Sequence, residues 1–177
     1  TEKLDFQISQ DSSEFTLEAA NDVIKDLLIA VVLVALIMLL FLHSIRNAVI
    51  VMIAVPASIV ATFTVMLLAG FTLNLMSLLA LSLVVGILVD DAIVVIENIY
   101  RHLEMGKSIA QASYDGIREI GGTVVSITLV IVVVFVPLTL TGGLISGILT
   151  QFSITVAVAT LLSLLVAFTL IPLLTSR

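Results

Sequence analysis

The sequence predicts an all-α membrane protein, a bundle of five transmembrane helices preceded by a short N-terminal strand. The first observation is composition: 60% of the 177 residues are hydrophobic and 11% are charged, whereas soluble domains carry about 25% charged residues. The second is the presence of several charge-free runs of the length, about 20 residues, that a spanning helix needs. The third is the absence of cysteine, which excludes disulfides and thiolate metal sites.

The N-terminal stretch differs from the rest of the chain. Residues 1–26 hold seven of the thirteen acidic residues, so the acidity belongs to a tail and argues against nucleic-acid binding. Apolar and polar residues alternate from Leu4 to Ile8, which predicts a half-buried strand. The chain lacks an initial Met and a basic leader and ends directly after an apolar run. We therefore expect a fragment of a longer protein.

The first helix is expected to begin near Glu14, after a cap at Asp11-Ser-Ser, and to run unbroken into the membrane. A turn around Gly70 and Asn74 divides the long charge-free run that follows Arg46. Residues 1–22 then lie outside the bilayer and 23–177 form the membrane domain. The predicted spans are 24–43, 48–69, 75–98, 121–140 and 152–173.

Prolines affect three of these spans. Pro56 and Pro137 fall inside spans, which membrane helices tolerate when neighbouring groups satisfy the freed carbonyls. Pro172 is expected to mark the end of the fifth span. Between the third and fourth spans, residues 99–120 are polar and predict a loop, in which Ser108 caps a short surface helix.

Loop charge predicts the orientation of the chain. Basic residues lie in one set of loops, whereas the short loops near 70–74 and 141–151 contain none. Because basic loops stay in the cytoplasm, the N-terminal end is expected outside and the C-terminal end inside. The basic residues on the cytoplasmic side are Arg46, Arg101, Lys107, Arg118 and Arg177.

Two adjacent carboxyl groups, Asp90 and Asp91, lie near the middle of the third span. A charged side chain at this depth costs roughly 2.5–3.5 kcal/mol on insertion scales, and such residues usually mark an ion or proton path. Asp90 shares a helix face with Glu97, and Asp91 shares the adjacent face with Asn98, because seven residues make about two turns.

Gly86 and Ser82 continue the polar face of this helix at intervals of four residues. A stripe of small and polar residues is expected to face protein or water and not lipid. The plainer interpretation is a permanently protonated carboxyl that only forms hydrogen bonds. A pair of carboxyls that titrates as one coupled unit better explains why two are adjacent, and every lysine and arginine lies in a loop or at an end, away from the pair.

Other chemistry is weakly indicated. Gly106-Lys107-Ser108 resembles the end of a phosphate-binding loop, but Arg101 stands where that motif needs glycine. His43 and His102 are isolated at membrane edges, where an interfacial role is favoured over metal binding. We expect no metal site, no cofactor and no enzymatic activity.

The run from Gly86 to Asn98, with its Asp pair, resembles the fourth transmembrane helix of resistance–nodulation–division (RND) transporters, in particular the hydrophobe/amphiphile multidrug efflux branch. The resemblance extends over essentially the whole chain in matching order. The other matching motifs are Ala54-Val-Pro56, Phe135-Val-Pro137 with Gly142-Gly143, and Gln151-Phe-Ser-Ile-Thr155. The chain then resembles helices two to six, with residues 1–22 ending a periplasmic porter domain.

This resemblance implies a secondary active transporter that exports drugs or other amphiphiles from the bacterial inner membrane in exchange for protons. Asp90 and Asp91 would form the proton relay, with Glu97, Asn98 and Gly86 as possible accessories. The implied partners are the remaining half of the transporter, with a cationic residue on a helix absent from this chain, two further copies in a homotrimer, a periplasmic adaptor and an outer-membrane channel.

Two alternatives stay open from the sequence. One is a proton-coupled lipid or sterol transporter of the same superfamily, which shares the Gly-x-x-x-Asp-Asp pattern. The other is a structural membrane subunit whose Asp pair only binds a basic helix of a partner. The Ala-Val-Pro and Gln-Phe-Ser motifs favour the efflux branch.

Overall fold

The computed structural model describes residues 12–42, 45–140, 142 and 146–176 of the chain. These residues form five long α-helices and one short 3₁₀ helix and contain no strand. The strand predicted at residues 4–8 lies outside the described residues. The helices are α1 (Ser12–Leu42), α2 (Ile45–Leu68), α3 (Leu75–Glu104), α4 (Ile109–Phe135), η1 (Val136–Leu140) and α5 (Ser146–Thr175).

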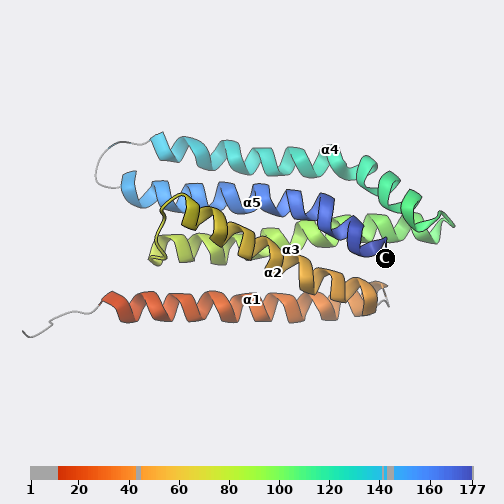
Figure 1. Cartoon of the computed structure of the whole chain (residues 1–177), viewed down its shortest axis with the longest axis horizontal. Coiled ribbons are helices and arrows are strands. Elements are labelled where there is room, and N and C mark those ends of the chain that lie inside the picture. The colour runs from red at the N-terminus through yellow and green to blue at the C-terminus, as the bar shows by residue number, and fades with distance from the viewer. Residues whose placement is uncertain (1–11, 43–44, 141, 143–145, 177) are drawn as a thin grey trace, which may run out of the picture.

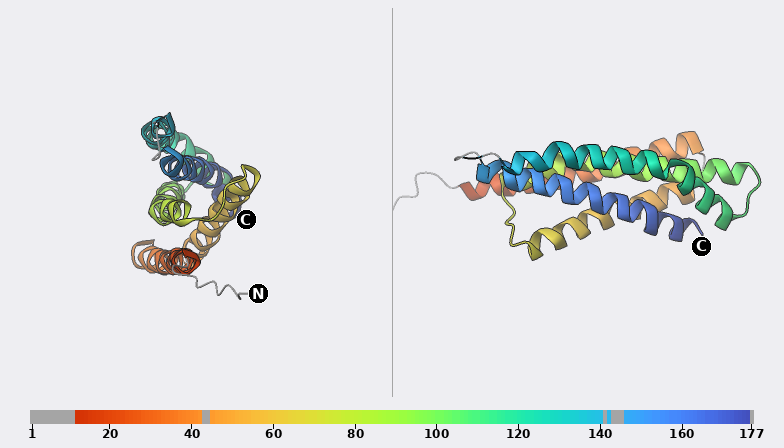
Figure 2. Two further views of the ribbon diagram at one scale, coloured as in Figure 1. Left: turned by 90° about the vertical axis from the view of Figure 1, so that its left-hand side faces the viewer. Right: turned by 90° about the horizontal axis from the view of Figure 1, so that it is seen from above.

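The helices run roughly along one common axis, with α1 on one side of the bundle and α4 on the other (Figure 1). Helix α3 packs against α1, α2, α4 and α5, and α5 packs against α2, α3 and α4. Seen along the bundle, α3 lies between α1 and the α4–α5 pair, and α2 lies along one side of this row of helices (Figure 2). The helix that carries the Asp pair is therefore the centre of this bundle.

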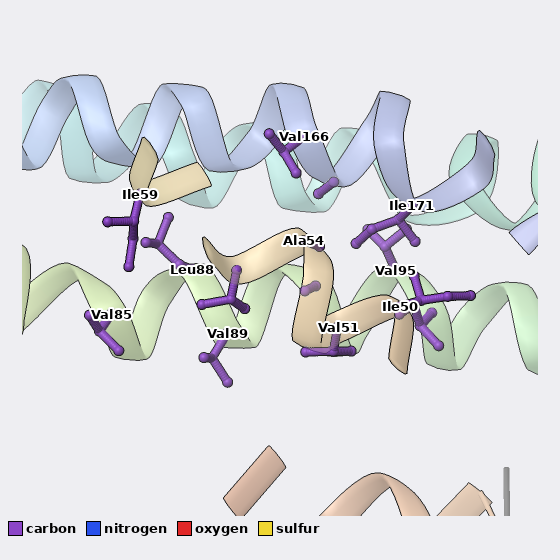
Figure 3. Close-up of a cluster of buried hydrophobic side chains, with 14 of the residues drawn as sticks. Ile50, Val51, Ala54, Ile59, Val85, Leu88, Val89, Val95, Val166 and Ile171 are labelled. Carbon is purple, nitrogen blue, oxygen red and sulfur yellow. The ribbon is translucent and has the colours of Figure 1, made fainter. Parts of the chain in front are cut away.

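Small and branched apolar residues hold α2, α3 and α5 together. Val51 and Ala54 of α2, Leu88 of α3 and Ile171 of α5 are all almost completely buried, and Figure 3 shows their side chains in one cluster. Small residues let helix backbones approach closely, which is how helices associate where lipid tails are as apolar as the side chains.

Within the described residues, four helical stretches are long and apolar enough to cross a membrane: Ile45–Leu68, Leu75–Glu104, Ile109–Leu140 and Ser146–Thr175. They cover the second to fifth predicted spans except for Ala69, the last residue of the second. The first predicted span, 24–43, stays a prediction. Its residues up to Leu42 lie in α1, which runs without a break from Ser12. The helix thus begins two residues before Glu14, near which its start is predicted.

The polar segment 99–120, the predicted connection between the third and fourth spans, is mostly helical. Helix α3 continues to Glu104 and α4 begins at Ile109. Ser108 caps α4 as predicted, accepting a hydrogen bond from the Gln111 amide. The capped helix is not a separate surface helix, because no proline interrupts it before Pro137 and it runs directly into the fourth span.

Prolines and turn residues act according to their backbone chemistry. Pro56 lies inside α2 as predicted. Helix α4 ends at Phe135 and the chain around Pro137 is a 3₁₀ helix, since proline lacks the donor that an α-helix needs. Pro172 does not end α5, which continues to Thr175. Gly70, with φ of +72°, makes the turn before α3.

Asn74 caps α3 and also ties it to α5. Its side chain accepts hydrogen bonds from the amides of Met76 and Ser77, and the Ser77 hydroxyl accepts one from the Asn74 amide. Its Nδ2 donates to Gln151 Oε1 at the start of α5. This capping box sets where α3 begins and therefore how far along the bundle the aspartates lie.

Candidate functional site

The two aspartates face different surroundings because consecutive residues on a helix point about 100° apart. The Asp91 side chain is buried between α3 and α5, where the Ser163 hydroxyl donates a hydrogen bond to Asp91 Oδ2 at 2.7 Å. Asp90 is exposed. One carboxyl is thus held inside the bundle and the other is free to meet water or a partner.

A cavity of about 510 Å³ lies beside the pair, between α3 and α4. Asp90 and Asp91 are its carboxyl groups and Thr123 is its other polar side chain. The rest of the wall is apolar apart from Gly86. The apolar residues are Ile87, Val89, Ile93, Val94, Ile120, Val124, Ile127 and Ile131.

The accessory residues divide along the same two faces. Asn98 is buried with Asp91, and its Nδ2 donates to the Gly116 carbonyl of α4 at 2.7 Å. Glu97 and Gly86 are exposed with Asp90. A second cavity, of about 400 Å³, contains Glu97 and shares Val94 and Ile120 with the first. The seven-residue spacing therefore places Asp91 and Asn98 on the face that packs against protein. It places Asp90 and Glu97 on the face that lines open space.

The basic side chains of Arg46 and Lys107 contact groups other than the two aspartates. Arg46 donates to the Thr175 carbonyl at 2.7 Å, and Lys107 pairs with Asp115 at 2.7 Å. Across the described ranges, no ion pair includes Asp90 or Asp91. A cationic partner for the pair stays a prediction.

A charged cluster joins the end of α3 to the start of α4. Arg101 donates to Glu119 Oε1, and His102 Nε2 lies 2.7 Å from Glu119 Oε2. His102 Nδ1 lies 2.9 Å from Lys107 Nζ; because the ammonium can only donate, Nε2 carries the ring proton. His102 thus has a structural role at the helix end. His43 lies outside the described residues.

These contacts lower the pKa values of two carboxyl groups, Asp115 and Glu119, which lie outside the predicted span 121–140. Hydrogen bonds from Arg101 and His102 hold the pKa of Glu119 well below its usual 4.5, at about 2. The hydrogen bond from Lys107 lowers the pKa of Asp115. Both carboxylates stay ionised at neutral pH, so they hold the α3–α4 corner and do not exchange protons there.

Glu119→Gln is expected to lower the melting temperature of the detergent-purified complete protein at neutral pH. A carboxyl with a depressed pKa stabilises the fold above its unfolded pKa of 4.5, and that contribution disappears as the pH falls through about 2. The difference between wild type and variant should therefore shrink steadily from pH 5 downward. Glu104→Gln, at an exposed carboxyl at the end of α3, serves as the control, and a difference independent of pH would contradict the assignment.

Ser163 is the site residue that the sequence alone did not identify. A signal was present, since buried small or polar residues recur on α5 every three or four positions at Ser153, Ala157, Thr160, Ser163 and Ala167. Thr128 and Ser126 donate hydrogen bonds back to carbonyls of their own helix. No group of three or more possible metal ligands occurs within the described part of the chain.

Comparison with known proteins gives a consistent result. The family described as AcrB/AcrD/AcrF matches residues 1–177. The multidrug resistance protein MdtC of Escherichia coli O139:H28 is 48% identical over 169 residues, which cover 96% of this chain and 16% of that protein. MdtC of Shigella flexneri and of Escherichia fergusonii show the same 48% identity and 96% coverage of this chain, over 17% and 16% of their own lengths. The chain thus spans about one sixth of these relatives.

Proposed function

Because the chain belongs to the AcrB/AcrD/AcrF family of RND transporters, we propose that it forms part of a proton-driven pump that exports drugs or other amphiphiles. The resemblance inferred from the sequence motifs is confirmed by the family match over residues 1–177. The relatives named MdtC are multidrug resistance proteins, which supports drugs as the exported class and makes the lipid or sterol alternative the weaker one.

Asp90 and Asp91 are the proposed proton relay of this pump. The single observation that carries the proposal is their contrast: Asp91 is buried on the Ser163 hydroxyl, whereas Asp90 is exposed beside a cavity of about 510 Å³. A proton relay needs one exposed group that accepts the incoming proton and one buried group that responds to the change in charge inside the bundle. A carboxyl that only forms a structural hydrogen bond does not require a second, exposed carboxyl beside it.

Glu97, Asn98 and Gly86 are proposed as accessories with different tasks. Glu97 lies in the adjoining cavity toward the charged end of α3 and is placed to receive protons on the cytoplasmic side. Asn98, through its bond to Gly116, holds α4 beside the relay. Gly86 leaves open space next to Asp90, since nothing lies within 4 Å of where a Cβ would be.

The partners and location belong to the same proposal. We place the chain in the bacterial inner membrane with its N-terminal end in the periplasm and its C-terminal end in the cytoplasm. The rest of the transporter supplies the cationic partner of the pair, and the pump works as a homotrimer with a periplasmic adaptor and an outer-membrane channel. The four membrane-crossing helices and the family match support this assembly.

Proton coupling is tested with the complete transporter in liposomes that carry an imposed pH gradient and an encapsulated pH dye. Adding a transported drug is expected to accelerate the collapse of the gradient, and a protonophore is expected to abolish drug movement. Drug movement that survives the protonophore would contradict proton drive. A protein that binds its partners normally but moves neither drug nor protons would support the structural-subunit alternative.

A further inference from the structure

We propose, on the basis of the pump function above, that Thr123 of α4 is a positioning residue of the proton relay, and that it holds the water that carries protons between Asp90 and the cavity of Glu97. Three observations carry the inference: a hydroxyl that is not bonded to its own helix, its level beside the Asp pair, and the cavity that it shares with both aspartates.

The Thr123 hydroxyl is available to a group outside α4. The hydroxyls of Ser126 and Thr128 on the same helix donate to the carbonyl four residues earlier. Thr123 makes no such bond to any residue that the structure describes, and its side chain is exposed. Because a hydroxyl has a single proton to donate, Thr123 can donate to water, whereas Ser126 and Thr128 have already used theirs.

Thr123 lies at the level of the Asp pair. Helices α3 and α4 are antiparallel neighbours joined by a short connection (Figure 1), and a Cβ at Gly116 would lie 3.1 Å from Ile99 Cα. Seven residues, about two turns and 10 Å, separate Gly116 from Thr123 on α4. The same two turns in the opposite chain direction on α3 lead from Ile99 to the residue directly after Asp91.

The cavity of about 510 Å³ brings the three polar side chains together. Asp90 and Asp91 line it from α3 and Thr123 lines it from α4, and its other side chains are apolar. An ordered water needs about two to four polar partners, so water is held best where it can reach both walls. A water bound to Thr123 on one side and to the exposed carboxyl of Asp90 on the other meets this condition.

This water also lies on the way to Glu97. The cavity of about 400 Å³ that contains Glu97 shares Val94 and Ile120 with the cavity of the pair, and Thr123 follows Ile120 by one turn of α4. Asp90 and Glu97 are seven residues apart, about 10 Å along α3. Direct proton transfer needs a separation of about 3 Å, so the two carboxyls require water between them, and Thr123 supplies a polar side chain at that place.

The proposed transfer balances with water alone. The Thr123 hydroxyl donates a hydrogen bond to the bridging water and so turns the protons of that water toward Glu97. When the relay releases a proton, Asp90 passes it to the bridging water, which passes one of its own to the next water, and the last water protonates Glu97. The Asp90 carboxylate and intact waters remain. Thr123 keeps its own proton throughout, so it orients the water and does not carry the proton.

The test uses the complete transporter in liposomes with an imposed pH gradient and compares Thr123→Val with wild type. Valine keeps the shape of threonine but lacks the hydroxyl, so proton-coupled drug transport is expected to fall by about three- to tenfold, the effect of one lost hydrogen bond. Thr123→Ser is expected to restore transport, because it returns the hydroxyl. Thr128→Val is the matched control, since the Thr128 hydroxyl is bonded to its own helix, and should leave transport unchanged.

The melting temperature of each variant is measured in parallel and is expected to equal that of wild type. If Thr123→Val transports like wild type, the hydroxyl does not position the water and the inference is wrong. If Thr123→Ser lowers transport and melting temperature as much as Thr123→Val does, Thr123 acts through packing and the inference is again wrong. Asp91→Asn separates these results from the proposed function: if it stops transport while Thr123→Val does not, the relay stands and only the role of Thr123 falls.

Discussion

Asp91→Asn in the complete transporter is expected to reduce drug efflux from energised cells by about 100-fold or more, the scale on which a lost acid–base group acts. The change is nearly isosteric, and the asparagine oxygen still accepts the hydrogen bond that Ser163 donates at 2.7 Å. The protein is therefore expected to fold and assemble normally. What disappears is the ability of the buried member of the pair to gain and lose a proton.

The measurement is drug accumulation in cells, with expression and assembly followed in parallel. Glu104→Gln, on the exposed end of the same helix, controls for removing any carboxyl from α3 and should leave efflux intact. Efflux that persists unchanged in Asp91→Asn would show that Asp91 is not an essential proton carrier. The structural interpretation of the pair would then take precedence.

The Ser163→Ala variant distinguishes the orientation of Asp91 from its ability to carry a proton. The variant keeps both carboxyls but removes the hydroxyl on which Asp91 is oriented. Efflux is expected to fall by about three- to tenfold and its pH profile to shift, because the buried hydrogen bond that orients Asp91 is lost. Thr160→Val is the matched control on α5, since the Thr160 hydroxyl bonds only to carbonyls of its own helix.

Gly116→Leu is expected to destabilise the bundle by about 3 kcal/mol, the upper end for forcing a side chain into a packed interface. A Cβ at Gly116 would lie 3.1 Å from Ile99 Cα and 3.2 Å from Ile99 N. Because these are backbone atoms, α3 and α4 must move apart. That movement also breaks the bond from Asn98 to the Gly116 carbonyl and leaves a buried amide without its acceptor.

Gly122→Leu provides the matched control one and a half turns further along α4, where nothing lies within 4 Å of the Cβ position. Thermal unfolding of the complete protein in detergent should show a clearly lower melting temperature for Gly116→Leu and little change for Gly122→Leu. Equal melting temperatures for the two variants would contradict the close approach of α3 and α4 at Ile99.

The sequence by itself determined the helices and the chemistry they carry. Hydrophobic runs long enough to span a bilayer, separated by turn residues such as Gly70 and Asn74, specify helix number and approximate position, because lipid leaves the backbone no alternative to bonding with itself. It also determined the presence of Asp90 and Asp91 at depth and the sharing of faces with Glu97 and Asn98, since helical spacing is set by local geometry alone.

Only the tertiary structure decided what each face meets. Spacing states the angle between Asp90 and Asp91 but not which of them turns toward Ser163, a residue 72 positions further along the chain. The contacts of Asp26 with Ser82 and of Asn98 with Gly116 likewise join helices whose relative rotation no local pattern encodes. The physical reason is that helix formation follows from nearby residues, whereas the rotation of one helix against another is set by how side chains distant in sequence fill shared space.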